Sequence, residues 1–512
     1  MSAISKTVGK FENNTIKTLL EKYKTLYALN YANDVLDWDT QVYMPKAGIV
    51  ERGTANAQIS LLYQKFFMSD DFRRALDEAN KQKDLNDYEN GVVRALNRQM
   101  KVMSLPPKLI EEEAMMATEG FVAWEKAKKN SDFNKFKPYL ERIIEINREK
   151  AEKLGYEGHP YNALVDLNEE GITVNDLDAI FSQMIPKLKA ILKSVTDSGI
   201  FTKEYKLAEI AYDKEAAKSA NEEILKIMGF DMARFRMDVS THPFTMPISV
   251  NDTRITTRYE GINFKNTLFS TIHEGGHAIY QLQGDPDLTM TPINDGASLG
   301  LHESQSRFFE NIIGRSREFV HAITPMLRSK FYFLKDYSEE DLYYYFNQVK
   351  PGCIRVDADE LTYNFHIVLR YELEKQLIEG KINANELPEL WDSKMEEYLG
   401  IRPRNDGEGV LQDVHWSSGF GYFPTYSLGN VAAALILYKV RAENSNFDSE
   451  IRAANLTPIK EWLKEKIHRF DGVYTPKELL RRSFNEGYNP EYLISYLREK
   501  FTISNESWKP RA

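Results

Sequence analysis

The sequence is poor in cysteine and in the residues that interrupt helices. Cys353 is the only cysteine among 512 residues, so no disulfide can form within the chain, which fits a reducing compartment such as the cytoplasm. The chain has 27 glycines and 19 prolines, together about 9 per cent against roughly 12 per cent in average proteins. With few such residues and many Glu, Lys, Leu and Ala, long helices are favoured.

The sequence also lacks long apolar runs and an excess of basic charge. The longest apolar stretch, Val431–Tyr438, is far shorter than the ~20 residues that a membrane span needs. The N-terminus has no apolar segment typical of a secretory signal. Sixty-six basic and 76 acidic residues give a net charge of −10, which counts against a protein that wraps nucleic acid. We therefore expect a cytoplasmic protein that binds neither membranes nor nucleic acid.

Hydrophobic residues make up 42% of the chain, enough for a large buried core. Apolar residues recur near helical spacing in segments along most of the sequence, at 11–30, 137–153, 176–196, 214–228 and 341–350. No long linker, repeat or low-complexity segment separates them. We predict a mainly α fold with a single large helical domain over residues 1–512. Its parts would be N-terminal helices to about 235, a middle part to about 430 that carries the motifs described below, and C-terminal helices.

One segment departs from helical spacing. Residues 247–259 alternate Ile248 and Val250 with polar residues, turn at Asn251-Asp252 and continue with β-branched residues. This pattern predicts a small antiparallel β-hairpin. Its open edge could bind an extended peptide as an added strand, or a neighbouring element could cover it.

Residues 273–277 read His-Glu-Gly-Gly-His, an HExxH motif, within a predicted helix over 265–283. Residues four apart share one helix face, so His273 and His277 can bind one metal ion. Glu274 can take a proton from the attacking water. The two intervening glycines cost about 1 kcal/mol each in a helix and suggest close approach of another segment or of substrate. A chance match to the motif is the competing interpretation.

A catalytic zinc of the two-histidine type needs a carboxylate from another element. Residues 298–313 predict a second amphipathic helix with Ser298 as its N-cap. Glu303 is the preferred ligand, and Glu310 is its rival. Glu303 could instead form a surface ion pair with Arg307.

Six short motifs occur along the chain, namely His242-Pro243-Phe244, DTRIT at 252–256, HEGGH at 273–277, HESQ at 302–305, IRVDAD at 354–359 and GVLQDVHW at 409–416. By these motifs, which occur in the family order, the sequence resembles the carboxypeptidase Taq family of metallocarboxypeptidases. No fixed position departs from the family pattern.

The resemblance implies a saddle-shaped helical fold with a deep substrate groove, and usually a homodimer. It implies one divalent metal, zinc or sometimes cobalt, held by His273, His277 and Glu303, with Glu274 as the base. The expected activity is the release of single residues from peptide C-termini, with broad specificity and a poor rate after proline. Alternatives are an oligopeptide endopeptidase or dipeptidyl carboxypeptidase with the same metal site, or a helical binding protein without turnover.

A carboxypeptidase must bind a free α-carboxylate, for which the planar guanidinium of arginine is suited. Arg355 is preferred over Arg254. The alternative for Arg355 is an ion pair with Asp357 or Asp359, and for Arg254 a cross-strand pair.

Other substrate-binding candidates lie in the remaining motifs and just after them, namely His242, Gln412, His415, Tyr422 and Tyr426. By similarity to the angiotensin-converting-enzyme type, His415 would bind the substrate backbone and one tyrosine would aid the transition state. Simple packing is the alternative for both tyrosines. His302 is expected behind a metal ligand, and Cys353 in the core.

Overall fold

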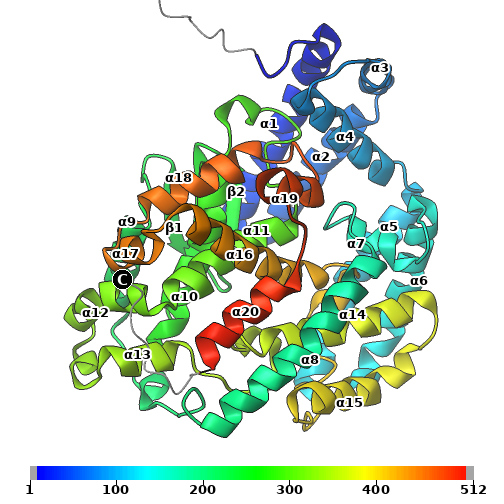
Figure 1. Cartoon of the computed structure of the whole chain (residues 1–512). Coiled ribbons are helices and arrows are strands. Elements are labelled where there is room, and N and C mark those ends of the chain that lie inside the picture. Colours follow the sequence, from blue (N-terminus) through cyan, green and yellow to red (C-terminus); the bar gives the residue numbers. More distant parts are fainter. Residues whose placement is uncertain (1–8, 503–512) are drawn as a thin grey trace, which may run out of the picture.

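The computed structural model describes residues 9–502, so residues 1–8 and 503–512 of the predicted domain lie outside it. Helices dominate this part of the chain, and the prediction of a mainly α fold is confirmed (Figure 1). In chain order the α-helices are α1 (Asn14–Val42), α2 (Ile49–Phe67), α3 (Asp70–Asn80), α4 (Asp87–Met103), α5 (Pro107–Asn130), α6 (Lys137–Leu154), α7 (Tyr161–Asp166), α8 (Val174–Ser198), α9 (Lys214–Ile227), α10 (Phe264–Leu282), α11 (Leu299–Arg307), α12 (Arg317–Lys330), α13 (Glu339–Phe346), α14 (Tyr363–Glu379), α15 (Leu387–Leu399), α16 (Pro424–Glu443), α17 (Phe447–Arg452), α18 (Thr457–Lys466), α19 (Pro476–Phe484) and α20 (Pro490–Phe501).

All five helices predicted from periodicity are present; three have bounds within two residues of the prediction, and the first and the last differ more. The first continues to Val42 after an N-cap at Asn13, whose side chain accepts from the backbone N–H groups of Thr15 and Ile16. The segment predicted over 341–350 is α13, which begins at Glu339 because Ser338 and Asp341 form a capping box. Local capping therefore set the N-terminal ends that apolar spacing misjudged, whereas the helices end at Val42 and Phe346 instead of at 30 and 350.

The predicted hairpin is present, and a third strand joins it. The strands are β1 (Phe235–Val239), β2 (Thr245–Ser249) and β3 (Asp252–Thr257), in the order β1-β3-β2. β2 and β3 are antiparallel, whereas β1 lies parallel to β3. β1 was not predicted, because its pairing joins segments that no short turn connects. The sheet is therefore mixed, and β2 forms one of its edges.

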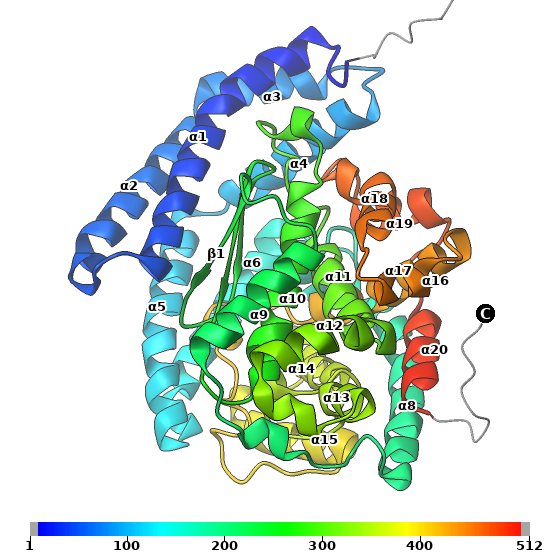
Figure 2. The ribbon, with the colours of Figure 1, turned by 90° about the vertical axis from the view of Figure 1, so that its left-hand side faces the viewer.

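Two large hydrophobic clusters organise the described chain, and a third, small one joins Leu225, Phe235, Ile255 and Ala278. The largest joins buried residues from Leu105 to Phe501. The second lies among α1–α4 and reaches Leu288, Ile293 and Val473. Figure 2 shows α1 and α2 together at one side of the molecule, with α2 outermost. The N-terminal helices thus pack on a core of their own beside the main body.

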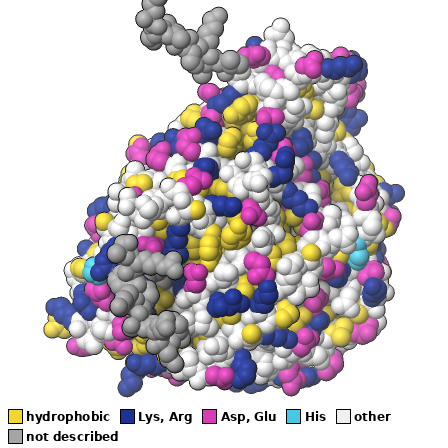
Figure 3. All heavy atoms as spheres, viewed as in Figure 1, with side chains coloured by type: hydrophobic (Ala, Val, Ile, Leu, Met, Phe, Trp, Pro, Cys, Tyr) yellow, Lys and Arg dark blue, Asp and Glu magenta, His cyan; other side chains and the backbone are white. Residues whose placement is uncertain are grey.

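Charged side chains of both signs are interspersed over the face shown in Figure 3, in keeping with the similar numbers of basic (66) and acidic (76) residues in the chain. Among residues 9–502, none of the helices combines the length and the apolar character that crossing a lipid bilayer requires.

Candidate metal centre and substrate groove

Glycines let three helices approach closely around the HExxH motif. A Cβ added at Gly276 of α10 would lie 2.6 Å from Ser306 Cα and 2.7 Å from Gln305 O, both backbone atoms at α11. Gly429 of α16 similarly faces Glu303, whose Cβ would lie 2.8 Å from an added Cβ. The glycine at position 276 therefore admits another segment of the chain, one of the two explanations expected from the sequence.

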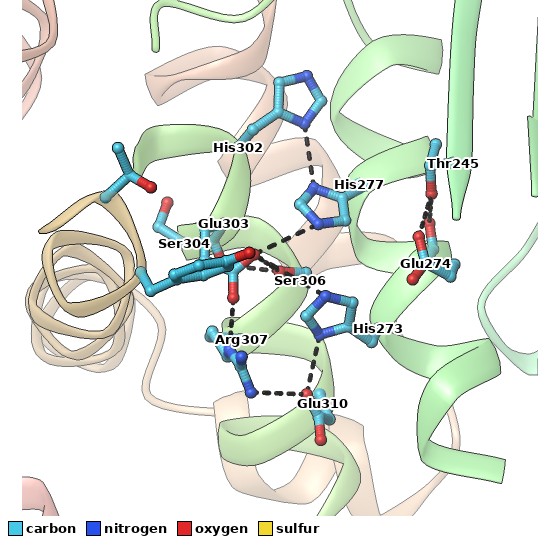
Figure 4. A network of polar contacts seen from close by, with 12 residues as sticks. Thr245, His273, Glu274, His277, His302, Glu303, Ser304, Ser306, Arg307 and Glu310 are labelled. Carbon is cyan, nitrogen blue, oxygen red and sulfur yellow. Dashed lines mark hydrogen bonds and ion pairs between the residues drawn. The ribbon is translucent and has the colours of Figure 1, made fainter. Parts of the chain in front are cut away.

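His273, His277 and Glu303 lie together across the contact between α10 and α11 (Figure 4). One ligand atom from each lies within 4.8 Å of the others. Glu303 Oε2 is 3.8 Å from His273 Nε2 and 3.5 Å from His277 Nε2. Two imidazole nitrogens and a carboxylate oxygen are the donor set of many catalytic zinc sites. The residues present therefore fit a divalent metal.

The outer nitrogens of both imidazoles have partners of their own. His273 Nδ1 is 2.9 Å from Glu310 Oε2, and His277 Nδ1 is 3.1 Å from His302 Nδ1. Such contacts orient a metal-binding imidazole and fix which nitrogen is free to bind. Glu310, the rival ligand, thus lies behind His273, on the π-helical turn Phe308–Gly314 that follows α11.

The charges around the cluster favour an ionised carboxylate beside a neutral imidazole. Burial raises the pKa of Glu303, but Arg307 and the two imidazoles outweigh it and hold that pKa well below its usual range. Arg307 Nε donates to Glu303 Oε1 at 2.7 Å. Burial lowers the pKa of His277. Glu303 and His277 therefore have the protonation states that a metal requires. At His273 the neighbouring Glu303 and Glu310 outweigh burial and raise the pKa, so a metal must compete with a proton there.

Glu274 is held between α10 and the sheet. Its Oε2 accepts a hydrogen bond from Thr245 Oγ1 of β2 at 2.6 Å, and the residue is 8% exposed. Figure 4 shows its carboxylate on the sheet side of His273. Glu274 also lines the cavity in front of the metal ligands, where it can accept a proton from a reacting water. Thr245 belongs to no motif, and the sequence reasoning missed it.

A cavity of about 1280 Å³ lies in front of these residues. Segments far apart in the sequence form its walls, including α5, the start of α10, the IRVDAD motif and residues 412–430. The candidate site residues that line it are His242, His273, Glu274, Glu303, Arg355, Gln412, His415 and Tyr426. Arg254, His277 and Tyr422 are not among the lining residues.

Arg355 pairs with Asp413, which the sequence analysis did not consider. Its Nε and Nη2 donate to the two carboxylate oxygens at 2.9 Å each, and Nη1 donates to Tyr363 Oη at 2.9 Å. Arg370, fully buried, forms an ion pair with Asp413 at 2.5 Å. Two guanidinium groups thus share one carboxylate, which leaves a net charge of +1 at the cavity wall.

Arg254 forms two hydrogen bonds of 2.7 Å with Asp252, on the same strand. Its guanidinium also lies 5.7 Å from the centre of the Trp38 ring. The cross-strand pair that was the alternative for Arg254 is therefore not formed.

The wall that carries His415 is aromatic. The His415 ring lies 5.7 Å from that of Tyr422, and Tyr426 Oη lies 3.5 Å from His415 Nε2. Burial and the nearby Arg355 lower the pKa of His415 to about 4. A neutral His415 therefore faces the cavity at physiological pH.

Two further candidates have structural contacts. The Gln412 side chain accepts from the backbone N–H of Arg355 at 2.7 Å and donates to the backbone of Cys353 and Glu408. His242 lines the cavity, and its carbonyl accepts from Ser240 Oγ at 2.6 Å. Cys353 was expected in the core, and it packs against the core but is only half-buried, because it lies in the loop before the IRVDAD motif.

An HExxH helix, a glutamate from a second helix and a deep groove in a helical fold together define a metallopeptidase. The comparisons with known proteins agree. The family model of the carboxypeptidase Taq (M32) metallopeptidases matches residues 18–501. The chain belongs to this family, whose members are peptide hydrolases, and it is a metallocarboxypeptidase.

Its relatives cover nearly the whole chain. Thermostable carboxypeptidase 1 of Pyrococcus furiosus is 44% identical over 96% of this chain and 99% of its own length. Carboxypeptidase 1 of Bacillus subtilis is 37% identical over 95% of this chain and 98% of its own length. The solved structure of the Pyrococcus furiosus carboxypeptidase, at 44% identity, has a TM-score of 0.95 and covers 96% of this chain and 100% of its own. Metallocarboxypeptidase 1 of Trypanosoma cruzi has a TM-score of 0.92 at 35% identity, over 96% and 99%.

Proposed function

We propose that this protein removes single amino acids from the C-termini of peptides, with His273, His277 and Glu303 as ligands of one zinc ion. Cobalt would be a possible replacement. The observation that carries the proposal is the convergence of the three donors beside Glu274 at a cavity of about 1280 Å³. A pocket of this size holds several residues of a peptide.

A divalent metal on these ligands would polarise the scissile carbonyl and lower the pKa of a water molecule. Glu274 then takes a proton from the attacking water and passes it to the leaving amine. Thr245 keeps the Glu274 carboxylate oriented toward the cavity through its 2.6 Å hydrogen bond. Neutral His415 donates a hydrogen bond to the substrate backbone, and Tyr422 or Tyr426 stabilises the developing oxyanion.

The substrate α-carboxylate binds at Arg355. The argument is the uncompensated charge of +1 left by Arg355, Arg370 and Asp413 at the cavity wall. Arg254 is the weaker candidate because Asp252 alone neutralises its guanidinium and because the residue does not line the cavity. Arg355→Met should therefore raise KM about a hundredfold, whereas the control Arg254→Met should change it little. A larger increase in KM for Arg254→Met than for Arg355→Met would instead assign the α-carboxylate to Arg254.

The peptide lies extended along β2, whose position at the edge of the sheet leaves backbone groups for an added strand. Backbone pairing depends little on side chains, so a broad specificity follows. A proline beside the scissile bond lacks the N–H that pairing uses, so a poor rate after proline also follows. His242 and Gln412 flank this path and contact substrate or the loops around it.

The protein acts as a homodimer. In support, α2 exposes the apolar residues Ile49, Val50, Leu61 and Leu62, each more than half exposed, and residues 53–64 carry no charged side chain. Such an apolar helix face is typical of an interface. Sedimentation of the Leu61→Glu, Leu62→Glu double variant should give monomers from a dimeric parent. A dimer that survives both charges would place the interface elsewhere.

The decisive experiment is a digest of a long peptide, followed by mass spectrometry, before and after chelation. Losses of one residue at a time from the C-terminus support the proposal, and amidation of that terminus should block them. Internal cuts or two-residue steps would instead indicate an endopeptidase or a dipeptidyl carboxypeptidase. Stoichiometric zinc without hydrolysis would indicate a binding protein.

The control for the chemistry is Glu274→Gln. It preserves shape and leaves the three metal ligands in place, so zinc content should match the parent while nearly all turnover is lost. Retained turnover in zinc-loaded Glu274→Gln would refute the assignment of the base.

A further inference from the structure

Glu374 is a buried carboxylate behind the aromatic wall of the groove, and no motif includes it. It lies on α14 and is 1% exposed. Tyr161 Oη donates to its Oε2 at 2.6 Å, the Gly421 N–H donates to the same oxygen at 3.1 Å, and Trp416 Nε1 donates to Oε1 at 2.8 Å. Within residues 9–502, all of its hydrogen-bond donors are neutral groups.

Through these hydrogen bonds, Glu374 of α14 connects α7 with the loop that precedes α16. Tyr161 begins α7, whereas Trp416 and Gly421 lie at the two ends of one loop. Gly421 has φ +93°, and a Cβ there would lie 2.5 Å from Leu164 O of α7. The loop is therefore pressed against α7, and Glu374 binds it at two points five residues apart.

Residues of the aromatic wall adjoin these two points. His415 precedes Trp416 and lines the cavity, and Tyr422 follows Gly421. Their rings lie 5.7 Å apart. Glu374 holds both ends of the loop, so the positions of the two side chains depend on Glu374.

We propose that Glu374 is a positioning residue whose carboxylate sets the placement of His415 in the groove wall. The inference rests on the proposed function, in which His415 binds the substrate backbone. The side chain is buried among neutral donors, so the fold keeps an acid here at a cost that an apolar residue would avoid. A carboxylate accepts from all three donors at once, which no amide of the same size can do.

Glu374→Gln tests the inference. Whichever oxygen becomes the amide nitrogen, it meets the N–H of either Trp416 or Gly421 and leaves that donor without a partner. We expect kcat/KM for a short peptide to fall about tenfold or more, while the zinc dissociation constant stays within about twofold of the parent. The matched control is Glu372→Gln, on the same helix, whose carboxylate pairs with Lys394 and Tyr398 away from the groove. It should retain parental kcat/KM.

A double-mutant cycle with His415→Ala separates positioning from general damage to the fold. If Glu374 acts through His415, Glu374→Gln should cost less than about twofold in the His415→Ala background. Losses that multiply would overturn the inference even where His415→Ala alone lowers kcat/KM. If His415→Ala alone has no effect, the proposed role of His415 fails, and with it the inference.

Tyr161→Phe provides the same test if Glu374→Gln does not fold. It removes one donor and keeps the ring, so a fall in kcat/KM of about threefold is expected, again suppressed by His415→Ala. Parental kcat/KM in Tyr161→Phe, or a loss that multiplies with that of His415→Ala, would overturn the inference.

Discussion

Replacement of Gly276 by alanine should separate the metal ligands by forcing α10 and α11 apart. The added Cβ would lie 2.6 Å from Ser306 Cα and 2.7 Å from Gln305 O. Carbon atoms in contact prefer about 3.5–4.0 Å, so the two backbones must separate by about 1 Å. Neither neighbour is a flexible side chain that could rotate away.

The cost can be worked out from two opposing effects. Alanine in place of glycine inside a helix gains about 1 kcal/mol. Overpacking of a rigid contact costs about 1–3 kcal/mol, so metal-free Gly276→Ala should lose up to about 2 kcal/mol of unfolding free energy. Metal ligands tolerate displacements of only about 0.2 Å. A shift of Glu303 with α11 should therefore weaken zinc binding about tenfold or more.

Urea unfolding of the metal-free protein measures the first quantity, and zinc titration against a competing chelator measures the second. Gly53→Ala is the matched control, since it lies inside the exposed helix α2 with no atom within 4 Å of the added Cβ. It should gain about 1 kcal/mol and leave zinc affinity unchanged. Gly275→Ala should be intermediate, because its Cβ meets the flexible end of Met228. If Gly276→Ala equals Gly53→Ala in both measurements, the close approach does not position the ligands.

Three other predictions concern the metal and pH. Glu310→Gln removes the charged partner of His273, so chelator competition should show zinc affinity lowered about tenfold or more; parental affinity would contradict this. Zinc at about a hundred times its dissociation constant should raise the unfolding free energy of the parent by about 2.7 kcal/mol, and an equal gain in Glu303→Ala would contradict the ligand assignment. Burial lowers the pKa of His468 to about 3, so the unfolded chain takes up this proton first as pH falls below about 6.5. Unfolding free energy should then decrease with falling pH, and urea unfolding of His468→Gln should show a slope shallower by up to about 1.4 kcal/mol per pH unit; an unchanged slope would contradict the assignment.

Local patterns carried much of the sequence analysis. Apolar spacing located α10 and α11, Ser298 was recognised as the N-cap of α11, and alternation located β2 and β3. These features depend on neighbours within a few residues, which the sequence displays directly. β1 was missed because its partner β3 is distant in the chain and its own residues, FRMDV, alternate weakly.

The contacts of the arginines could not be read in the same way. Asp357 and Asp359 were the nearest acids in sequence to Arg355, yet its partner Asp413 comes from another loop. Arg370 reaches the same carboxylate from α14. Ion pairs in a folded core depend on which segments meet, and sequence distance carries little information about that.

The sequence by itself determined the elements and the side chains they carry: a helix with two imidazoles on one face, a glutamate beside them, and a second helix with two candidate carboxylates. Only the tertiary structure decided which acid meets the imidazoles and which stands behind one of them, because Glu303 and Glu310 differ only in how α11 and its π-helical turn pack against α10. It likewise decided that Glu374 binds both ends of the loop next to His415. Helical periodicity is a local property of the chain, whereas convergence of distant side chains depends on the packing of the whole core.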